Sequence, residues 1–252
     1  MIFLISFLVV IIGFVVLFNI PVMAAQEPTV DEGFLNGLLN VNSSNGTLEL
    51  VLLITLLSLA PSLLILMTSF TRIIIVFSLL RNAMGIQQTP PNQVLAGLAL
   101  FLTMFIMAPV FSDINDVAYK GYKSGELSTM EAAKAATVPL KEWMLKQTST
   151  DSMAFFLDLA EVKMPTENIA ENLGLHLVVP AFIISELKRA FIIGFLLFIP
   201  FLVIDIIVSS TLMSMGMIML PPAMISLPFK ILLFIMIDGW QLLAGTLVKG
   251  FD

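Results

Sequence analysis

The sequence of 252 residues contains no cysteine, one histidine and few charged residues. The absence of cysteine excludes disulfide bonds, thiolate metal sites and cysteine nucleophiles. Only 12% of the residues are Asp, Glu, Lys or Arg, whereas 58% are hydrophobic. Because so little charge could not cover the surface of a soluble protein, the composition predicts an integral membrane protein.

The chain also lacks the features of nucleic-acid and nucleotide binding. Its net charge is −6, whereas a nucleic-acid footprint needs a basic patch or stripe. No G-x-x-x-x-G-K-[ST] loop occurs, so energy for any transport would come from partners or from the proton motive force. Ser185 and Lys188 form an S-x-x-K pattern, but no SDN or KTG motif accompanies it. No enzymatic activity, cofactor or metal site is predicted.

The amino-terminal region has the pattern of an export signal. Residues 1–25 are mostly apolar and end in the small residues Ala24 and Ala25, which predicts a cleavable signal sequence, with a retained first span as the alternative. Residues 26–46 are acidic and rich in Asn, Gly and Ser. They are predicted to form an extracytoplasmic tail.

Residues 47–111 are predicted to form a first helical hairpin. Two long apolar stretches are separated by a polar turn at residues 82–93. Arg72 and Arg81 are the charges assigned to this turn, so the positive-inside rule places it on the cytoplasmic side.

Residues 112–172 differ from their surroundings because they carry 16 of the chain's 30 charged residues. They are predicted to form an extracytoplasmic helical module. Ser128 and Glu131 have the spacing of a capping box at a helix start. Pro139 is expected to open a further helix at its first turn.

Residues 173–252 are predicted to form a second helical hairpin, with apolar arms at 190–208 and 223–248. The arms are joined by LMSMGMIMLPP at residues 212–222, here called the methionine turn. It shares the pattern MG-x4-PP with the first turn at an offset of 131 residues. The two hairpins are therefore predicted to be parallel repeats in an all-α polytopic membrane protein.

The two turns differ in their variable residues, which are polar in the first and apolar in the second. Irregular backbone at membrane depth is tolerated only where it is buried in protein or lines a cavity. Methionine can repack around moving partners, so the methionine turn is predicted to close a pore. The alternatives are an adaptable core loop and a Cu(I) transporter that uses the thioethers. The predicted gate residues are Met215, Gly216, Met217, Ile218 and Met219.

Sparse charges within the second hairpin form two further sets of candidates. Asp205, Lys230 and Asp238 lie in apolar runs, where a charge must find a partner or line water. A proton or ion relay through Asp205 and Asp238, and with it an ion transporter, is the alternative. The second set is predicted to contact neighbouring subunits, or in the case of the two aromatic residues to pack within the chain: Trp143, Phe156, Glu186, Lys188 and Arg189.

Four sequence segments resemble the FliP family of flagellar type III export-gate proteins and their virulence secretion relatives. They read LMTSFTRIIIVFSLLRNAMG, QQTPPNQVLAGLALF, PAFIISELKRAFIIGFLLFIPFLVID and LMSMGMIMLPP. The resemblance extends from about residue 48 to the end. The signal sequence favours the flagellar branch, with a virulence secretion homologue as the alternative. Gates of this family often read GMMMLPP, and Ile218 here replaces the middle methionine.

The resemblance implies a function that the residues alone do not give. It implies a protein that assembles with itself as a pentamer, and with FliQ, FliR and other export-gate proteins, into a channel for unfolded export substrates. It also implies contact with membrane lipid, a place in the bacterial inner membrane at the flagellar basal body, and closure of the lumen by the methionine turn.

Overall fold

The computed structural model describes residues 54–55, 58, 62, 65–86, 89–165, 167–217 and 220–251. The chain divides into two units, Met1–Leu56 and Leu57–Asp252, and the helices named below belong to the second. The predicted signal sequence and extracytoplasmic tail lie outside the described residues. So do Ile218 and Met219 of the predicted gate.

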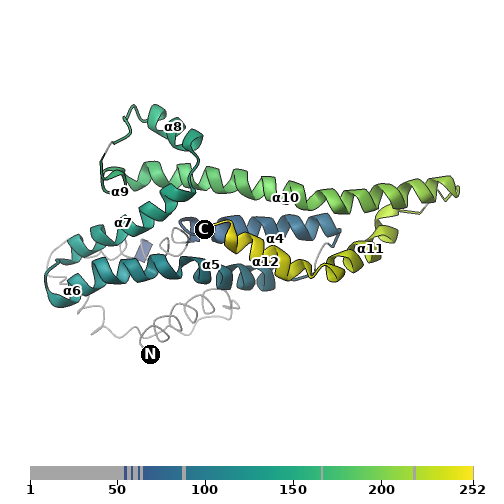
Figure 1. Cartoon of the computed structure of the whole chain (residues 1–252), viewed down its shortest axis with the longest axis horizontal. Coiled ribbons are helices and arrows are strands. Elements are labelled where there is room, and N and C mark those ends of the chain that lie inside the picture. The colour runs from purple at the N-terminus through teal and green to yellow at the C-terminus, as the bar shows by residue number, and fades with distance from the viewer. Residues whose placement is uncertain are drawn as a thin grey trace. The chain divides into compact units, whose positions relative to one another are not determined.

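Throughout the described residues the secondary structure is helical, with no strand among them, which confirms the predicted all-α class. The elements in chain order (Figure 1) are α4 (Phe70–Met84), α5 (Asn92–Ile114), the π-helix η1 (Asn115–Tyr119), α6 (Lys120–Ser124), α7 (Thr129–Gln147), α8 (Thr150–Leu159), α9 (Ile169–Asn172), α10 (Leu175–Ser214), α11 (Pro222–Met236) and α12 (Gly239–Lys249).

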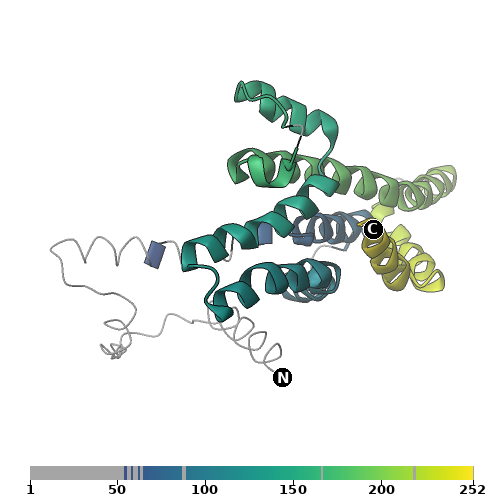
Figure 2. The ribbon, with the colours of Figure 1, turned by 60° about the vertical axis from the view of Figure 1, so that its left-hand side comes forward.

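Helix α10 organises the packing of this unit. It has 40 residues and is therefore about 60 Å long. It lies beside α4 in both ribbon views (Figures 1 and 2) and also contacts α7, α8 and α11. Phe77 of α4 and Phe182 of α10 are completely buried in one core cluster. Gly194 brings the two helices close, since a Cβ there would lie 2.2 Å from Leu79 Cδ1.

Two of the described helices are long and apolar enough to cross a membrane. One is Asn92–Ser124, which is α5 continued through η1 and α6, and the other is α10. Helices α11 and α12 make a third candidate if the pair, bent by 61°, counts as one span. These lengths agree with a bilayer core that requires about 20 apolar residues for a helical crossing.

The structure differs from the sequence prediction at the ends of these spans. The span expected to end at residue 111 continues as helix to Ser124. The run expected to be continuous over 223–248 breaks at Asp238, whose φ of 50° lies in the left-handed region. Aspartate tolerates that region better than most residues. Gly239 completes the bend, because a Cβ there would lie 2.2 Å from Phe234 Cε2.

Helix α7 begins at the predicted capping box. The Ser128 side chain accepts a hydrogen bond from the Glu131 backbone N–H, and the Ser128 backbone N–H donates to Glu131 Oε2 at 2.9 Å. Pro139 does not open a new helix, as the sequence analysis expected, but lies inside α7. Leu140 and Trp143 just beyond it are buried, and their packing holds the helix together through the proline.

Ser128→Ala should lower the free energy of unfolding by about 1 kcal/mol, because the first turn of α7 loses its cap. Thermal unfolding of the purified chain in detergent, followed by circular dichroism, measures the change. Thr137→Ala is the matched control, since the Thr137 hydroxyl donates only to Lys134 O within the same helix. Equal melting temperatures for the two variants would contradict the capping role.

Candidate functional site

The methionine turn places apolar side chains at the end of α10. The Gly216 N–H donates to Met213 O at 3.1 Å and the Met217 N–H donates to Leu212 O at 3.0 Å, which closes the helix. Gly216 has a φ of 74°, a conformation that glycine adopts without steric cost. Around it Met213, Met215, Met217 and Leu220 are 66%, 72%, 41% and 39% exposed.

The first turn has the same backbone geometry. Gly85 has a φ of 79°, its N–H donates to Asn82 O at 3.0 Å, and the Ile86 N–H donates to Arg81 O at 3.3 Å. The shared Met-Gly pair therefore has a structural cause, since glycine at this position lets the backbone reverse while capping the last carbonyls of the helix.

Side chains distinguish the two turns. Arg81 Nη1 donates to Asn92 Oδ1 and, at 3.4 Å, to Pro90 O, which closes the first turn with polar contacts. At the offset of 131 residues, Arg81 and Asn92 are replaced by Leu212 and Ala223. The methionine turn therefore lacks the groups that would make the same bridge.

An apolar groove adjoins the methionine turn between α10 and α11. Its volume is about 440 Å³, and its lining residues include Leu212, Met215, Ile225 and Phe229. Thr211 is the polar residue in this lining, and its hydroxyl donates to Ile207 O within α10. The groove thus extends the apolar surface of the turn along the two helices.

Asp205 and Lys230 form an ion pair near the two turns. Lys230 Nζ lies 2.6 Å from Asp205 Oδ2 and donates to Ala83 O at 3.2 Å. Ser226 Oγ donates to Asp205 Oδ1 at 2.6 Å. Lys230 is only 5% exposed. The pair joins α10, α11 and the carboxyl end of α4, so it fixes α10 and α11 against the first turn.

Arg72 forms the most buried charge cluster among the described residues. It is here called the Arg72 cluster and comprises Arg72, Gln147, Glu186, Arg189 and Phe251. Arg72 is 2% exposed and Glu186 is 0% exposed. Two parallel hydrogen bonds join them, one from Arg72 Nε to Glu186 Oε2 at 2.7 Å and one from Nη2 to Oε1. Such a bidentate pair fixes orientation as well as charge.

The remaining contacts of the Arg72 cluster connect α7 and the end of the chain. Arg72 Nη1 donates to Gly250 O at 2.9 Å, and its guanidinium carbon lies 3.6 Å from the centroid of the Phe251 ring. Gln147 Oε1 accepts from Arg189 Nη1 at 2.9 Å, while Gln147 Nε2 donates to Phe251 O at 3.0 Å. The cluster thus ties α4, α7, α10 and the carboxyl-terminal residues together.

Comparison with known proteins decides the family. A family model described as "FliP family" matches residues 53–247, more than half of the chain. The flagellar biosynthetic protein FliP of Caulobacter vibrioides is 52% identical over 219 residues, 84% of this chain and 82% of that protein. The one from Bacillus subtilis is 51% identical over 223 residues, 86% of this chain and all of that protein. The chain belongs to the FliP family.

Membership confirms the resemblance drawn from the sequence. The FliP-family match includes both turns, the Asp205–Lys230 pair, Arg72 and Glu186. It makes the chain a membrane component of the flagellar export apparatus, and the relatives above are named as biosynthetic proteins of the flagellum.

The residues predicted to contact neighbouring subunits do not share one environment in the structure of this FliP-family chain. Glu186 binds Arg72 of the same chain, and Trp143 is buried with its ring centroid 5.4 Å from that of Phe182. Phe156 is half-buried and Lys188 is exposed. Contact with a neighbouring subunit therefore stays a prediction.

Two charges lie elsewhere than the sequence suggested. Arg72 was assigned to the first turn, but it lies near the start of α4, 12 residues before that helix ends at Met84, and is buried. Arg81 alone therefore supports the predicted side of the turn. Asp238 lies exposed at the bend between α11 and α12, whereas Asp205 and Lys230 are joined.

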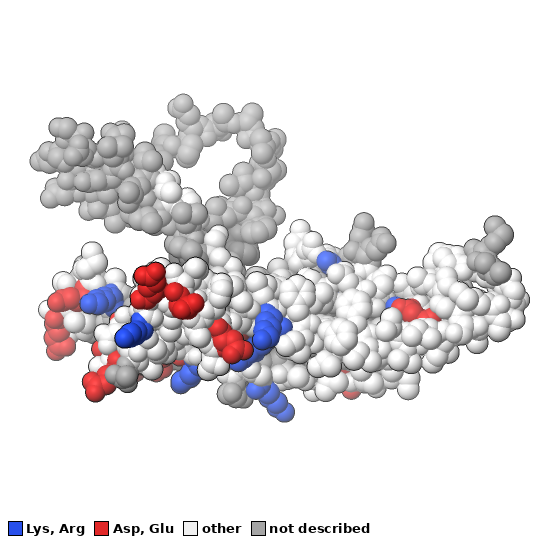
Figure 3. Space-filling view, turned by 90° about the horizontal axis from the view of Figure 1, so that it is seen from above, with Lys and Arg blue, Asp and Glu red and all other residues white. Residues whose placement is uncertain are grey.

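The charge-rich segment 112–172 forms a separate polar region. Figure 3 shows Lys, Arg, Asp and Glu gathered over one part of the visible face, with most of the rest uncharged. Lys141 within it is buried, and its amino group donates to Leu173 O at 3.1 Å. Burial lowers the pKa of Lys141, against an opposing effect of the Glu171 charge. This contact joins α7 to the start of α10.

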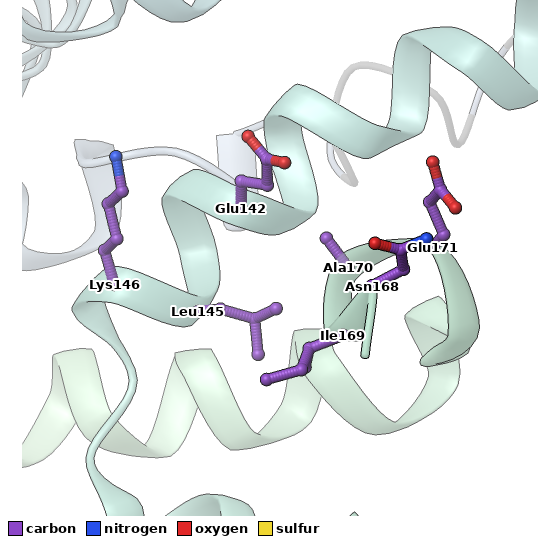
Figure 4. Close-up of a pocket in the computed structure, with 7 residues that line it drawn as sticks. All are labelled: Glu142, Leu145, Lys146, Asn168, Ile169, Ala170 and Glu171. Atoms are coloured by element: carbon purple, nitrogen blue, oxygen red, sulfur yellow. The ribbon is translucent and has the colours of Figure 1, made fainter. Parts of the chain in front are cut away.

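A shallow groove of about 530 Å³ lies between α7 and α9. Figure 4 shows Leu145 and Ile169 facing each other across it, with the charged side chains of Glu142, Lys146 and Glu171 around its rim. No sequence pattern indicates this groove, because its two sides come from helices that are separated by α8 in the chain.

Proposed function

We propose that this FliP-family chain is a channel-forming subunit of the flagellar protein export gate in the bacterial inner membrane. Copies of the chain assemble as a ring, a pentamer in the family resemblance, together with FliQ, FliR and other export-gate proteins. Unfolded export substrates pass through the lumen, and the methionine turn closes it between substrates. The observation that carries this proposal is the exposed apolar surface of the methionine turn.

Exposure at this turn favours an apolar partner. Four side chains between Met213 and Leu220 are at least 39% exposed, and they do not have the Arg81–Asn92 bridge that closes the first turn. Apolar surface gains free energy when another surface covers it. Copies of the same turn around an axis would cover one another, and unbranched thioether side chains would yield to a passing polypeptide.

The proposed topology has both turns on the cytoplasmic side and residues 112–172 outside. Lys230 supports it, because this side chain lies eight residues after Pro222 and donates to Ala83 O beside the first turn. A contact between the regions of the two turns is expected if the hairpins are parallel repeats. Arg81 supplies the positive charge at the first turn.

Replacing Met217, Ile218 and Met219 together by alanine should raise the ion conductance of the assembled complex, because shorter side chains leave the lumen open. Conductance across a planar bilayer or dye leakage from proteoliposomes measures this. The matched control replaces Ile86, Gln87 and Gln88, which occupy the equivalent positions of the first turn. Unchanged conductance in the first variant, with intact assembly, would overturn the gate.

A further inference from the structure

A groove beside the Arg72 cluster carries an excess of positive charge. Its volume is about 480 Å³, and it is called the basic groove here; its lining includes Arg72, Lys146, Gln147, Arg189, Ile192 and Ile193. Glu186 pairs with Arg72, and its charge also acts on Arg189. Neither Lys146 nor Arg189 lies within ion-pair distance of a carboxylate in the described part of the chain. The lining therefore has three basic side chains, and Glu186 offsets the charge of one of them.

The guanidinium of Arg189 is held in place at the groove. Its Nη1 donates to Gln147 Oε1 at 2.9 Å, and the same oxygen accepts from Arg72 Nη2 at 3.3 Å. The other N–H groups of Arg189 have no hydrogen-bond partner among the described residues. Because Gln147 is itself anchored to Phe251 O, the groove presents oriented donors, a geometry that suits phosphate or carboxylate oxygens.

The basic groove lies where charge gives way to apolar surface. Arg189 is the last charged residue of α10 before the apolar stretch 190–204. Just beyond it Phe191, Ile192 and Phe195 are 59%, 51% and 69% exposed. A cation at the end of an exposed apolar span lies at the depth of lipid headgroups.

This position also conflicts with the usual distribution of charge. On the proposed topology the groove faces the outer side, where the positive-inside rule disfavours Lys and Arg. Two further lysines, Lys188 and Lys249, are exposed next to Arg189 and Gly250. The phosphates of anionic lipids attract cations at that depth.

We propose that the basic groove binds the phosphate of an anionic phospholipid in the outer leaflet. Arg189 and Lys146 hold the phosphate oxygens, and Ile192 and Ile193 contact the lipid below its headgroup. A free phosphate ion would use the same donors but would gain nothing from the two isoleucines. The outer-leaflet assignment rests on the topology of the proposed function, whereas the binding itself does not.

Native mass spectrometry of the full-length chain and of its assembled oligomer tests this proposal. The probes are phosphatidylglycerol, zwitterionic phosphatidylcholine and inorganic phosphate. Phosphatidylglycerol should bind to both forms and resist competition by phosphate. Lys146→Gln with Arg189→Gln should weaken it roughly 30-fold, since each basic side chain at an anionic membrane contributes about a factor of five. Lys146→Gln alone should cost about fivefold without touching the contacts of Gln147.

Lys123→Gln with Lys134→Gln is the matched control, because it removes the same charge from two exposed residues outside the groove. Equal binding of phosphatidylcholine, equal competition by phosphate, or the same loss in the control would overturn the proposal. Lipid that binds to the single chain but not to the oligomer would also overturn the proposal. That result would indicate that a carboxylate of a second copy occupies the groove in the oligomer. None of these results changes the conductance expected for the gate variant, so the lipid proposal and the gate proposal are tested independently of each other.

Discussion

Glu186→Ala should lower the free energy of unfolding by about 3–5 kcal/mol, because it leaves the Arg72 guanidinium buried without its counter-charge. Both side chains are at most 2% exposed, so water does not replace the lost carboxylate. Chemical unfolding of the purified chain in detergent measures the change. Lys188→Ala on the same helix is the control and should cost little, since Lys188 is exposed and forms no ion pair in the described residues.

A double-mutant cycle separates the pair from the rest of the Arg72 cluster. Arg72→Met, Glu186→Met and the combined variant should show that the double change costs less than the sum of the single changes, because the uncompensated charge arises only in the single variants. Additive costs would show that the two side chains are not coupled, and would contradict the structure at this point.

This prediction differs from the one that the sequence suggested for the same residue. Read as a contact to a neighbouring subunit, Glu186 with reversed charge would yield a folded chain that fails to form rings. With Arg72 of the same chain as its partner, charge reversal should destabilise the chain itself. Size-exclusion chromatography together with circular dichroism distinguishes a folded monomer from an unfolded one.

The local features of the fold could be read from the sequence because short-range chemistry determines them. The Met-Gly pairs end their helices with the left-handed glycine that this position favours, and Ser128 with Glu131 makes the expected cap. The apolar runs in α5 and α10 correspond to helices long enough to cross a membrane, and the run in α11 and α12 does so if that bent pair counts as one span.

Pairings between distant residues could not be read in the same way. Arg72 and Glu186 are 114 positions apart, and neither local sequence indicates which residue the side chain binds. The sequence therefore assigned Arg72 to a turn and Glu186 to an interface between subunits. For Asp205 and Lys230 the sequence predicted that charges in apolar runs need partners. It did not predict that these two residues form an ion pair while Asp238 lies exposed at the bend. At the bend after Asp238, Gly239 lies so close to Phe234 that a Cβ there would be 2.2 Å from Phe234 Cε2, a contact that hydropathy does not encode.

Lys230→Met should lower the free energy of unfolding by about 2 kcal/mol, the scale of hydrogen bonds that involve a charged group, and should loosen α11 from the first turn. The estimate stays below that for Glu186 because the Asp205 side chain is 36% exposed and water partly screens it. The same unfolding measurement, with conductance of the assembled complex as a second readout, detects both effects. Lys249→Met, at an exposed lysine of α12, is the control.

Combining Lys230→Met with Asp205→Asn distinguishes a structural anchor from a proton relay. If the pair anchors α11 to α4, the double variant should recover part of the stability and of the export that Lys230→Met loses, because no unpaired carboxylate remains and Ser226 can still donate to the amide oxygen of the introduced asparagine. If Asp205 carries protons, both Asp205→Asn and the double variant should assemble normally and export nothing. Recovery of export in the double variant therefore supports the anchor, and its complete absence in a stable, assembled complex contradicts it.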